Sequence, residues 1–227
     1  EYLVKTGWLK SDKKLVSTYI MHSVIASAIR FQNEEQLYEK CRYVIHSISK
    51  EMECKEQDHG AEKSYLIPFS WSISDVLQDH LCDEQDAGFL TNLAYIYYDI
   101  GNYENAYLFF LRALEIDKQA VGEESVTVSS DYYNLADVSY NMYRFSESLR
   151  YLRKALSIRK KYYSSDDSEI LVLIKLFAGV YAKLNRLDRA ERLYLWAADI
   201  FEQNPDTDIL LLSTLYADIA SFFRERG

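Results

Sequence analysis

The amino-acid sequence predicts an all-α fold, a right-handed α-solenoid in which helix pairs stack on one another. The 227 residues include only 7 Gly and 2 Pro, so turn formers are scarce and long helices are favoured over a sandwich or barrel. Hydrophobic residues make up 48% of the chain, which excludes global disorder. One sequence pattern recurs with a fixed period from position 86 onward, as expected for a repeated helical unit: Leu93 corresponds to Leu135 and Ala94 to Ala136, and both pairs differ by 42 in number.

Each copy of the repeat predicts two amphipathic helices joined by a tight turn. Apolar residues of the first helix recur at the helical spacing i, i+3, i+4 and i+7, and Gly101–Asn102 ends that helix. Small residues fall where helices cross, because a large side chain there would hold the helices apart. They are Ala94, Ala136, Ala178 and Ala220 on the first helices, and Ala106, Ser148, Ala190, Ala113, Ala155 and Ala197 on the second helices.

The residues before the repeats predict two further segments, 1–33 and 34–85, ahead of the repeat array at 86–227. In the first, two short strands around Trp8–Leu9 and in 15–21 precede a helix at 24–31, an order typical of the end of a winged-helix domain. The second segment is expected to be a helical adaptor or a degenerate first repeat. Its expected elements are a helix at 34–57, a polar break at 58–63 and a helix at 64–81 that bends near Pro68.

Charge and motifs argue against several classes of function. The net charge of −9 arises entirely within 61–126, which contains twelve acidic and three basic residues. Because nucleic-acid binding needs positive charge, we expect no nucleic-acid partner. A basic cluster at 150–161 is interpreted as a solvated helix face. There is no apolar run of membrane-spanning length and no signal peptide, so we expect no membrane partner and a cytoplasmic location. The four His and three Cys form no catalytic or zinc motif, so we expect no enzyme activity, no cofactor and no metal.

The repeat resembles a known family. Small residues at Ala94, Ala106 and Ala113, together with Leu93 and Tyr97, resemble the tetratricopeptide repeat. The period of 42 is longer than the usual repeat of about 34 residues and is similar to that of the kinesin-light-chain type of this repeat.

The link between copies carries the same resemblance. That type has a Gly after the second helix, matched by Gly122, and an Asn before Leu-Ala, matched by Asn92 and Asn134. The third copy departs from the pattern with Leu176, and the fourth has Asp218.

By this resemblance, side chains on the inner face of the first helices would hold a protein or peptide ligand. The Asn amides offer both donors and acceptors, and the Tyr rings offer rigid contact area. The Asp residues would favour a basic ligand residue, and the Lys residues an acidic one. The alternatives are a solvated surface or a contact with another domain of a parent protein. The implied residues are Asn92, Tyr95, Tyr98, Asp99, Tyr133, Asn134, Asp137, Tyr140, Asn141, Lys175 and Lys183.

The first thirty residues resemble the winged-helix tail of signal-transduction ATPases with numerous domains (STAND, or NB-ARC-like, ATPases). Met21-His22-Ser23 aligns with the Met-His-Asp motif of those proteins, with Ser23 in place of Asp. The resemblance implies that His22 senses nucleotide phosphates in a longer parent protein, whereas the alternative is that His22 caps a helix. The chain opens with Glu1 rather than Met, and we expect it to be a piece of such a parent.

Together these observations predict a protein- or peptide-binding repeat module, the sensor or autoinhibitory arm of a multidomain signalling ATPase. The alternatives are a free-standing tetratricopeptide adaptor or scaffold and, third, a transcription regulator whose winged helix touches DNA.

Overall fold

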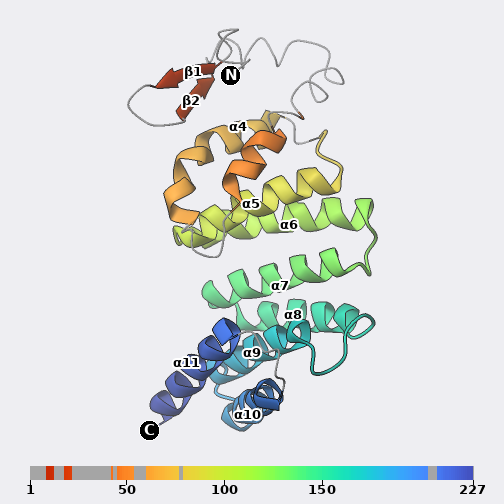
Figure 1. Ribbon diagram of the computed structural model, residues 1–227, viewed down its shortest axis with the longest axis vertical. Coiled ribbons are helices and arrows are strands. Elements are labelled where there is room, and N and C mark those ends of the chain that lie inside the picture. The colour runs from red at the N-terminus through yellow and green to blue at the C-terminus, as the bar shows by residue number, and fades with distance from the viewer. Residues whose placement is uncertain are drawn as a thin grey trace. The chain divides into compact units, whose positions relative to one another are not determined.

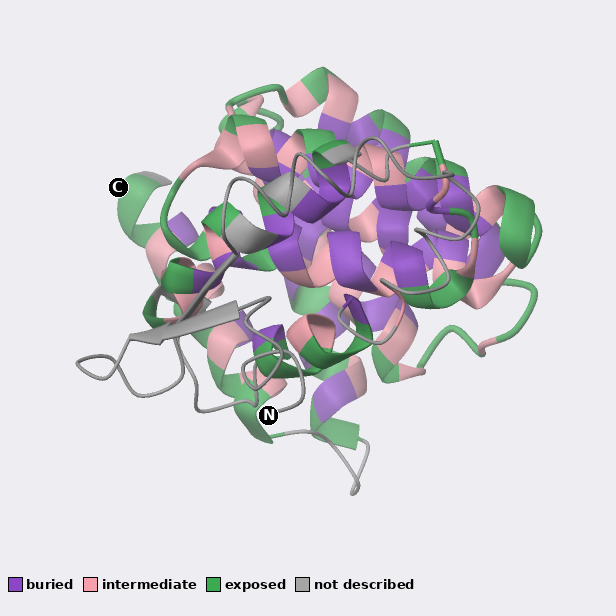
Figure 2. Ribbon diagram, turned by 90° about the horizontal axis from the view of Figure 1, so that it is seen from above, coloured by how far each residue is buried: buried purple, intermediate pink, exposed green. Residues whose placement is uncertain are grey.

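The computed structural model describes residues 9–12, 18–21, 42, 45–53, 60–76, 79–203 and 209–226. By their contacts the chain divides into two compact units, Glu1–Ala120 and Val121–Gly227, which are described separately. In both units consecutive helices form antiparallel pairs, and buried residues lie on the sides of the helices that face other helices (Figures 1 and 2). The predicted all-α fold is confirmed.

The first described elements of the first unit are two antiparallel strands, in which Leu9 pairs with Met21. A helical stretch at 45–52 follows, and then helices up to residue 120. The elements are β1 (Leu9–Asp12), β2 (Thr18–Met21), the 3-10 helix η1 (Gly60–Leu66), α4 (Ile67–Val76), α5 (Glu84–Asp99) and α6 (Tyr103–Ala120).

The second unit contains two complete helix pairs and one further helix among its described residues. The elements are α7 (Val126–Asn141), α8 (Phe145–Arg159), α9 (Ser168–Lys183), α10 (Leu187–Gln203) and α11 (Ile209–Arg226). The helices α5, α7 and α9 begin at 84, 126 and 168, and α6, α8 and α10 begin at 103, 145 and 187. Both series advance in steps of 42, which is the period predicted from the sequence.

The N-termini of the first helices are capped in every complete copy. Asp83 and Asp86 form a reciprocal capping box at the start of α5. Ser125 and Asp167 accept hydrogen bonds from backbone N–H groups in the first turns of α7 and α9. Each cap satisfies donors that have no partner within the helix, so the starting residue of each helix is set by its own sequence.

The turn within each pair has the same backbone geometry. Gly101, Tyr143 and Asn185 have φ values of 77°, 60° and 57°, the left-handed region. The following residue donates its N–H to a carbonyl of the last helical turn, for example Arg144 to Ser139 at 2.8 Å. This is a Schellman C-cap, which favours Gly or Asn at the left-handed position. Tyr143 therefore occupies a strained conformation.

The small residues predicted at the helix crossings are confirmed as core residues, with one exception. Each of the nine within complete pairs has 0% exposed surface, from Ala94 to Ala197. Ala220 is exposed, contrary to the prediction that it faces a partner helix. The described residues contain no helix after α11 that could cover it.

Residues 58–81 differ from the prediction. Gly60–Leu66 form a 3-10 helix where a polar break was expected over 58–63, and the following helix ends at Val76 rather than 81. Pro68 is the second residue of α4, in the first turn, where a helix tolerates a residue without an N–H. The helix expected at 24–31, together with His22 and Ser23, lies outside the described residues. The domain boundaries at 33 and 85 stay predictions.

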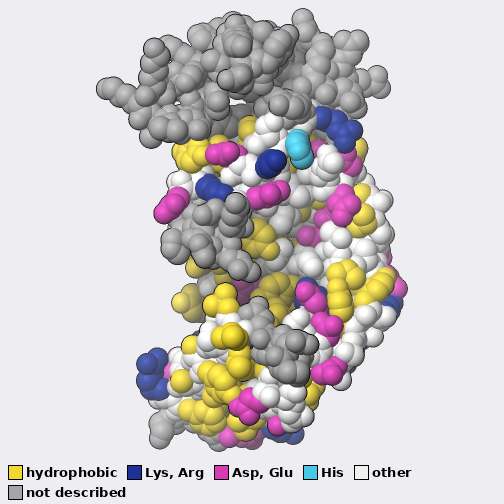
Figure 3. Space-filling view, viewed as in Figure 1, with side chains coloured by type: hydrophobic (Ala, Val, Ile, Leu, Met, Phe, Trp, Pro, Cys, Tyr) yellow, Lys and Arg dark blue, Asp and Glu magenta, His cyan; other side chains and the backbone are white. Residues whose placement is uncertain are grey.

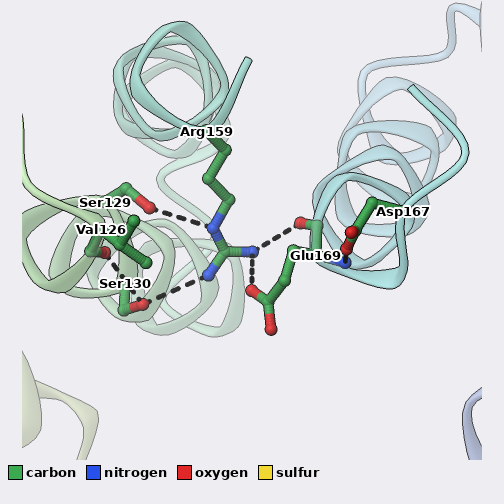
Figure 4. A network of polar contacts seen from close by, with 6 residues as sticks. All are labelled: Val126, Ser129, Ser130, Arg159, Asp167 and Glu169. Atoms are coloured by element: carbon green, nitrogen blue, oxygen red, sulfur yellow. Dashed lines mark hydrogen bonds and ion pairs between the residues drawn. The ribbon is translucent and has the colours of Figure 1, made fainter. Parts of the chain in front are cut away.

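A buried arginine joins three helices of the second unit (Figure 4). Arg159, the last residue of α8, is 5% exposed, so its assignment to a solvated basic face was wrong. Its guanidinium donates to Ser129 Oγ at 3.0 Å and Ser130 Oγ at 3.3 Å on α7. It also donates to the backbone carbonyl of Glu169 on α9 at 2.6 Å, and lies 3.0 Å from that residue's carboxylate. The planar, forked guanidinium can satisfy all of these acceptors at once.

Tyr143→Asn is expected to stabilise the protein by about 0.5–1 kcal/mol, because Asn adopts the left-handed conformation at lower cost than Tyr. Little packing is lost, since Tyr143 is 80% exposed. The reciprocal change Asn185→Tyr should destabilise by a similar amount. Urea unfolding of both variants checks this, and shifts of the same sign would contradict it.

Arg159→Met is expected to destabilise the protein by about 2–4 kcal/mol, because two hydroxyls and a buried carbonyl contact lose their shared donor. Glu169→Gln is the matched control. It keeps the backbone acceptor and changes only a half-exposed ion pair, so about 1 kcal/mol or less is expected. Equal losses in the two variants by urea unfolding would show that the surface ion pair, not the buried hydrogen bonds, stabilises this junction.

Candidate functional site

The predicted ligand-binding residues of α7 lie along that helix at helical spacing. Tyr133, Asp137, Tyr140 and Asn141 are partly exposed, and Asn134 is buried, with 8% of its surface exposed. Asn141 donates its amide to the Asp137 backbone carbonyl at 2.9 Å. The part of this row that a ligand can reach is therefore mainly Tyr133, Asp137 and Tyr140.

The two predicted lysines of α9 pair with side chains of α11. Lys175 donates to Thr214 Oγ1 at 3.0 Å and lies 3.7 Å from an Asp218 carboxylate oxygen. Lys183 lies 3.2 Å from a Glu225 carboxylate oxygen. The sequence analysis did not include Asp218 or Glu225 in the site. The sequence did contain a signal for Glu225. Lys183 and Glu225 are 42 residues apart, so they occupy equivalent positions of successive repeats, called a column below.

Gly179 lies between these lysines on α9, and two tyrosine hydroxyls occupy the space beside it. A Cβ atom placed on Gly179 would lie 3.5 Å from the Tyr194 hydroxyl of α10 and 3.8 Å from the Tyr140 hydroxyl of α7. Burial raises the pKa of Tyr194 far above its ordinary 10.0, and the nearby Asp218 and Glu225 raise it further. Burial also raises the pKa of Tyr140, while Lys183 opposes that rise. Both phenols therefore stay protonated at neutral pH.

In the first unit, the predicted residues lie on α5. Asn92 donates its amide to the Ser49 carbonyl at 3.2 Å and hydroxyl at 3.1 Å, so this side chain fastens the 45–52 helical stretch to α5. The Tyr95 ring packs edge-on against Phe110 with ring centroids 5.2 Å apart. Tyr98 makes a similar contact with Tyr103. Asp99 is exposed at the end of the helix.

The structure thus brings together seven of the eleven predicted residues in the second unit and describes the other four in the first. His22 lies outside the described residues. Within the part of the chain that the structure describes, no group of three or more His, Cys, Asp and Glu side chains could hold a metal ion. Among the described residues, no helix has both the length and the apolar character needed to cross a membrane.

The fold and the repeating columns agree with a known family. The sequence model of the tetratricopeptide repeat matches residues 86–161 and 128–203, which together span just over half of the chain. The chain belongs to the tetratricopeptide repeat family, whose repeats generally mediate protein–protein interaction and are typically non-catalytic. No curated protein matches the chain in sequence.

Solved structures show the same fold at low sequence identity. BtubC (BKLC) from P. vanneervenii is 18% identical with a TM-score of 0.62, over 90% of this chain and 82% of that one. The nearly identical tetratricopeptide-like repeats of a protein assigned as a kinesin light chain, from Podosopora anserina, are 14% identical with a TM-score of 0.60. That match covers 87% of this chain and 90% of the other. The similarity to kinesin-light-chain repeats predicted from the repeat period is confirmed at the level of the fold.

The buried hydroxyl of Tyr194 predicts a pH-dependent stability. Its pKa is higher in the folded state than the unfolded value of 10.0, so the stabilisation is full below pH 10 and is lost as pH rises toward the folded pKa. Tyr194→Phe should remove a decline of up to about 1.4 kcal/mol per pH unit above pH 10. Urea unfolding between about pH 9 and 11 measures this. Tyr143→Phe, which removes an exposed hydroxyl, should leave the decline unchanged, and the same profile in both variants would contradict the assignment.

Proposed function

We propose that the chain is a peptide-binding module and that the row of first helices forms its binding face. The observation that carries this proposal is the continuity of that row within the second unit. Residues about one repeat apart are neighbours on α9 and α11, since Lys183 contacts Glu225 and Lys175 contacts Asp218. An extended peptide that crosses α7, α9 and α11 would therefore meet one set of column residues per repeat.

The side chains on this face suit an extended peptide. Tyr133 and Tyr140 offer rigid aromatic area on α7, and Asp137 lies between them in sequence. A peptide main chain needs donors and acceptors along its whole length, and the phenol hydroxyls of Tyr140 and Tyr194 can serve as either. The face carries both signs of charge, which supports recognition by pattern more than general attraction to one sign of charge.

We also propose that the module works as the sensor or autoinhibitory arm of a longer signalling ATPase in the cytoplasm. The support is the resemblance of residues 8–30 to a winged-helix tail and the β1–β2 hairpin in that segment. A free-standing scaffold fits the fold equally well. The mass of the native polypeptide in its source cell separates the two, because an ATPase arm requires a polypeptide far larger than 26.6 kDa.

Peptide binding is tested by selecting random twelve-residue peptides, displayed on phage, against the purified chain. For the selected peptides, the double variant Tyr133→Ala with Tyr140→Ala should lower affinity by about tenfold or more, a loss of at least about 1.4 kcal/mol. Circular dichroism should show unchanged helicity.

The matched control is the double variant Leu108→Ala with Arg153→Ala, which changes exposed positions on the second helices α6 and α8. It should leave affinity unchanged. A library that yields no binding peptide, or peptides that the Tyr133 and Tyr140 changes do not affect, would overturn the proposed function.

A further inference from the structure

The last described helix, α11, carries an exposed row of mainly apolar residues along one side, called the α11 stripe below. Its members follow one another at intervals of four and three residues, the spacing of a seam between two paired helices. They are Ile209, Ser213, Tyr216, Ala220 and Phe223, and all five are exposed. Figure 3 shows hydrophobic side chains gathered over α11. No member of the stripe is charged, so a partner that covers it desolvates no charge there.

The same positions are buried where a helix is part of a complete pair. Three repeats earlier, the last four positions of the stripe are occupied on α5 by Ala87, Leu90, Ala94 and Tyr97, and all four are buried. There α5 packs against the antiparallel helix α6. The α11 stripe is therefore a surface of the kind that pairs with an antiparallel helix, and no helix among the described residues covers it.

Another side of α11 is anchored within the second unit. Leu215 and Phe222 are buried, and the Phe222 ring centroid lies 5.6 Å from that of Tyr194 on α10. The Tyr216 hydroxyl donates to Glu202 of α10, so the position of this stripe ring is also set by the second unit. The stripe is thus presented on a helix that is already fixed, and little conformational freedom has to be lost when a partner binds.

Large and small side chains alternate along the stripe, and the alternation is self-complementary. Asp218 lies midway between Tyr216 and Ala220 in the sequence. It also lies midway between Ser213 and Phe223. In an antiparallel pair of two α11 helices centred on Asp218, each large ring of one copy would therefore lie over a small residue of the other. Small residues let the two axes approach closely, and such reciprocal contacts are what a two-fold dimer requires.

We propose that the α11 stripe binds the same stripe of a second copy of this chain, so that two chains form an antiparallel pair of α11 helices. This interface lies apart from the proposed peptide-binding face. Asp137 and Tyr140 of that face correspond to Ser221 and Arg224 of α11, which lie outside the stripe. The dimer would therefore carry two peptide-binding faces, and a ligand with two recognition segments would bind it more tightly than a ligand with one.

The oligomeric state of the purified chain tests this proposal. A pair of single helices is at the small end of specific interfaces, so sedimentation velocity is measured from about 5 to about 500 μM chain. At low concentration the mass should be that of one chain, 26.6 kDa, and it should approach twice that value as the concentration rises. A mass that stays at 26.6 kDa over the whole range would overturn the inference.

Ala220→Glu should weaken the association by about tenfold or more, because the Tyr216 ring of the second copy no longer has a small residue to lie over. The variant should keep its fold, since Ala220 is exposed and the new carboxylate lies four residues before Arg224 on the same helix. Ala120→Glu, the same change at an exposed residue of α6, is the matched control and should leave association unchanged. Circular dichroism should show equal helicity, and equal effects of the two changes on association would contradict the inference.

Ser213→Glu and Phe223→Lys test the antiparallel arrangement. Each change alone should weaken the association by about threefold or more. The two changes combined in one chain should recover most of that loss, because in the antiparallel pair the new carboxylate of each copy faces the new ammonium group of the other. Losses that simply add in the combined variant would overturn the proposed pairing.

A helix from elsewhere on the stripe would give a different result. A synthetic peptide of residues 103–120, the sequence of α6, serves as the probe for a helix of the second kind. If the chain stays monomeric and binds this peptide, and Ala220→Glu abolishes the binding, the stripe pairs with such a helix and the inference of a dimer is wrong. If the chain dimerises as described but the phage library yields no binding peptide, the inference stands and the proposed function fails.

Discussion

The close approach of the two helices within each repeat is the constraint on which the rest of this structure depends. Nine small residues with no exposed surface, such as Ala136 and Ser148, let the helix axes come near enough for the larger apolar side chains around them to interlock. The caps and turns then fix where each helix begins and ends. The small residues, the helix caps and the turns recur once in every period, so each complete pair has the same local geometry as the one before it.

This regular geometry places side chains from successive copies beside one another. The first helices of neighbouring repeats therefore form one continuous surface within a unit. Pairs such as Lys183 and Glu225 meet because they occupy one column, not because either helix requires the other's charge to fold. Functional differences between copies then arise from single substitutions within a column. At the position of Tyr95, whose ring packs against Phe110, the third copy has Gly179 with the hydroxyls of Tyr140 and Tyr194 beside it.

The last described helix, α11, exposes positions that are buried in the complete pairs. On α11 the positions that correspond to buried residues of α5 carry Tyr216 at 40% exposure and Phe223 at 41% exposure. Hydrophobic side chains gather at the surface over this helix (Figure 3). Arg159 shows the opposite case, because a residue that belongs to a run of charges in the sequence is buried at the junction of three helices. In both cases burial follows from which helices are neighbours.

The sequence by itself determined the helical class, the repeat period, the small residues at the crossings and the breaks between paired helices, because these depend on contacts within one repeat and on local backbone preferences. It did not determine the 3-10 helix at Gly60–Leu66, whose short-range hydrogen bonds have no distinct hydrophobic period. Only the tertiary structure decided that Lys175 and Lys183 are paired by α11, that Asn92 fastens a preceding helix, and that the hydroxyls of Tyr140 and Tyr194 lie beside Gly179. These contacts depend on which polar side chains of one repeat touch the next repeat. The periodic pattern of apolar residues does not predict those contacts.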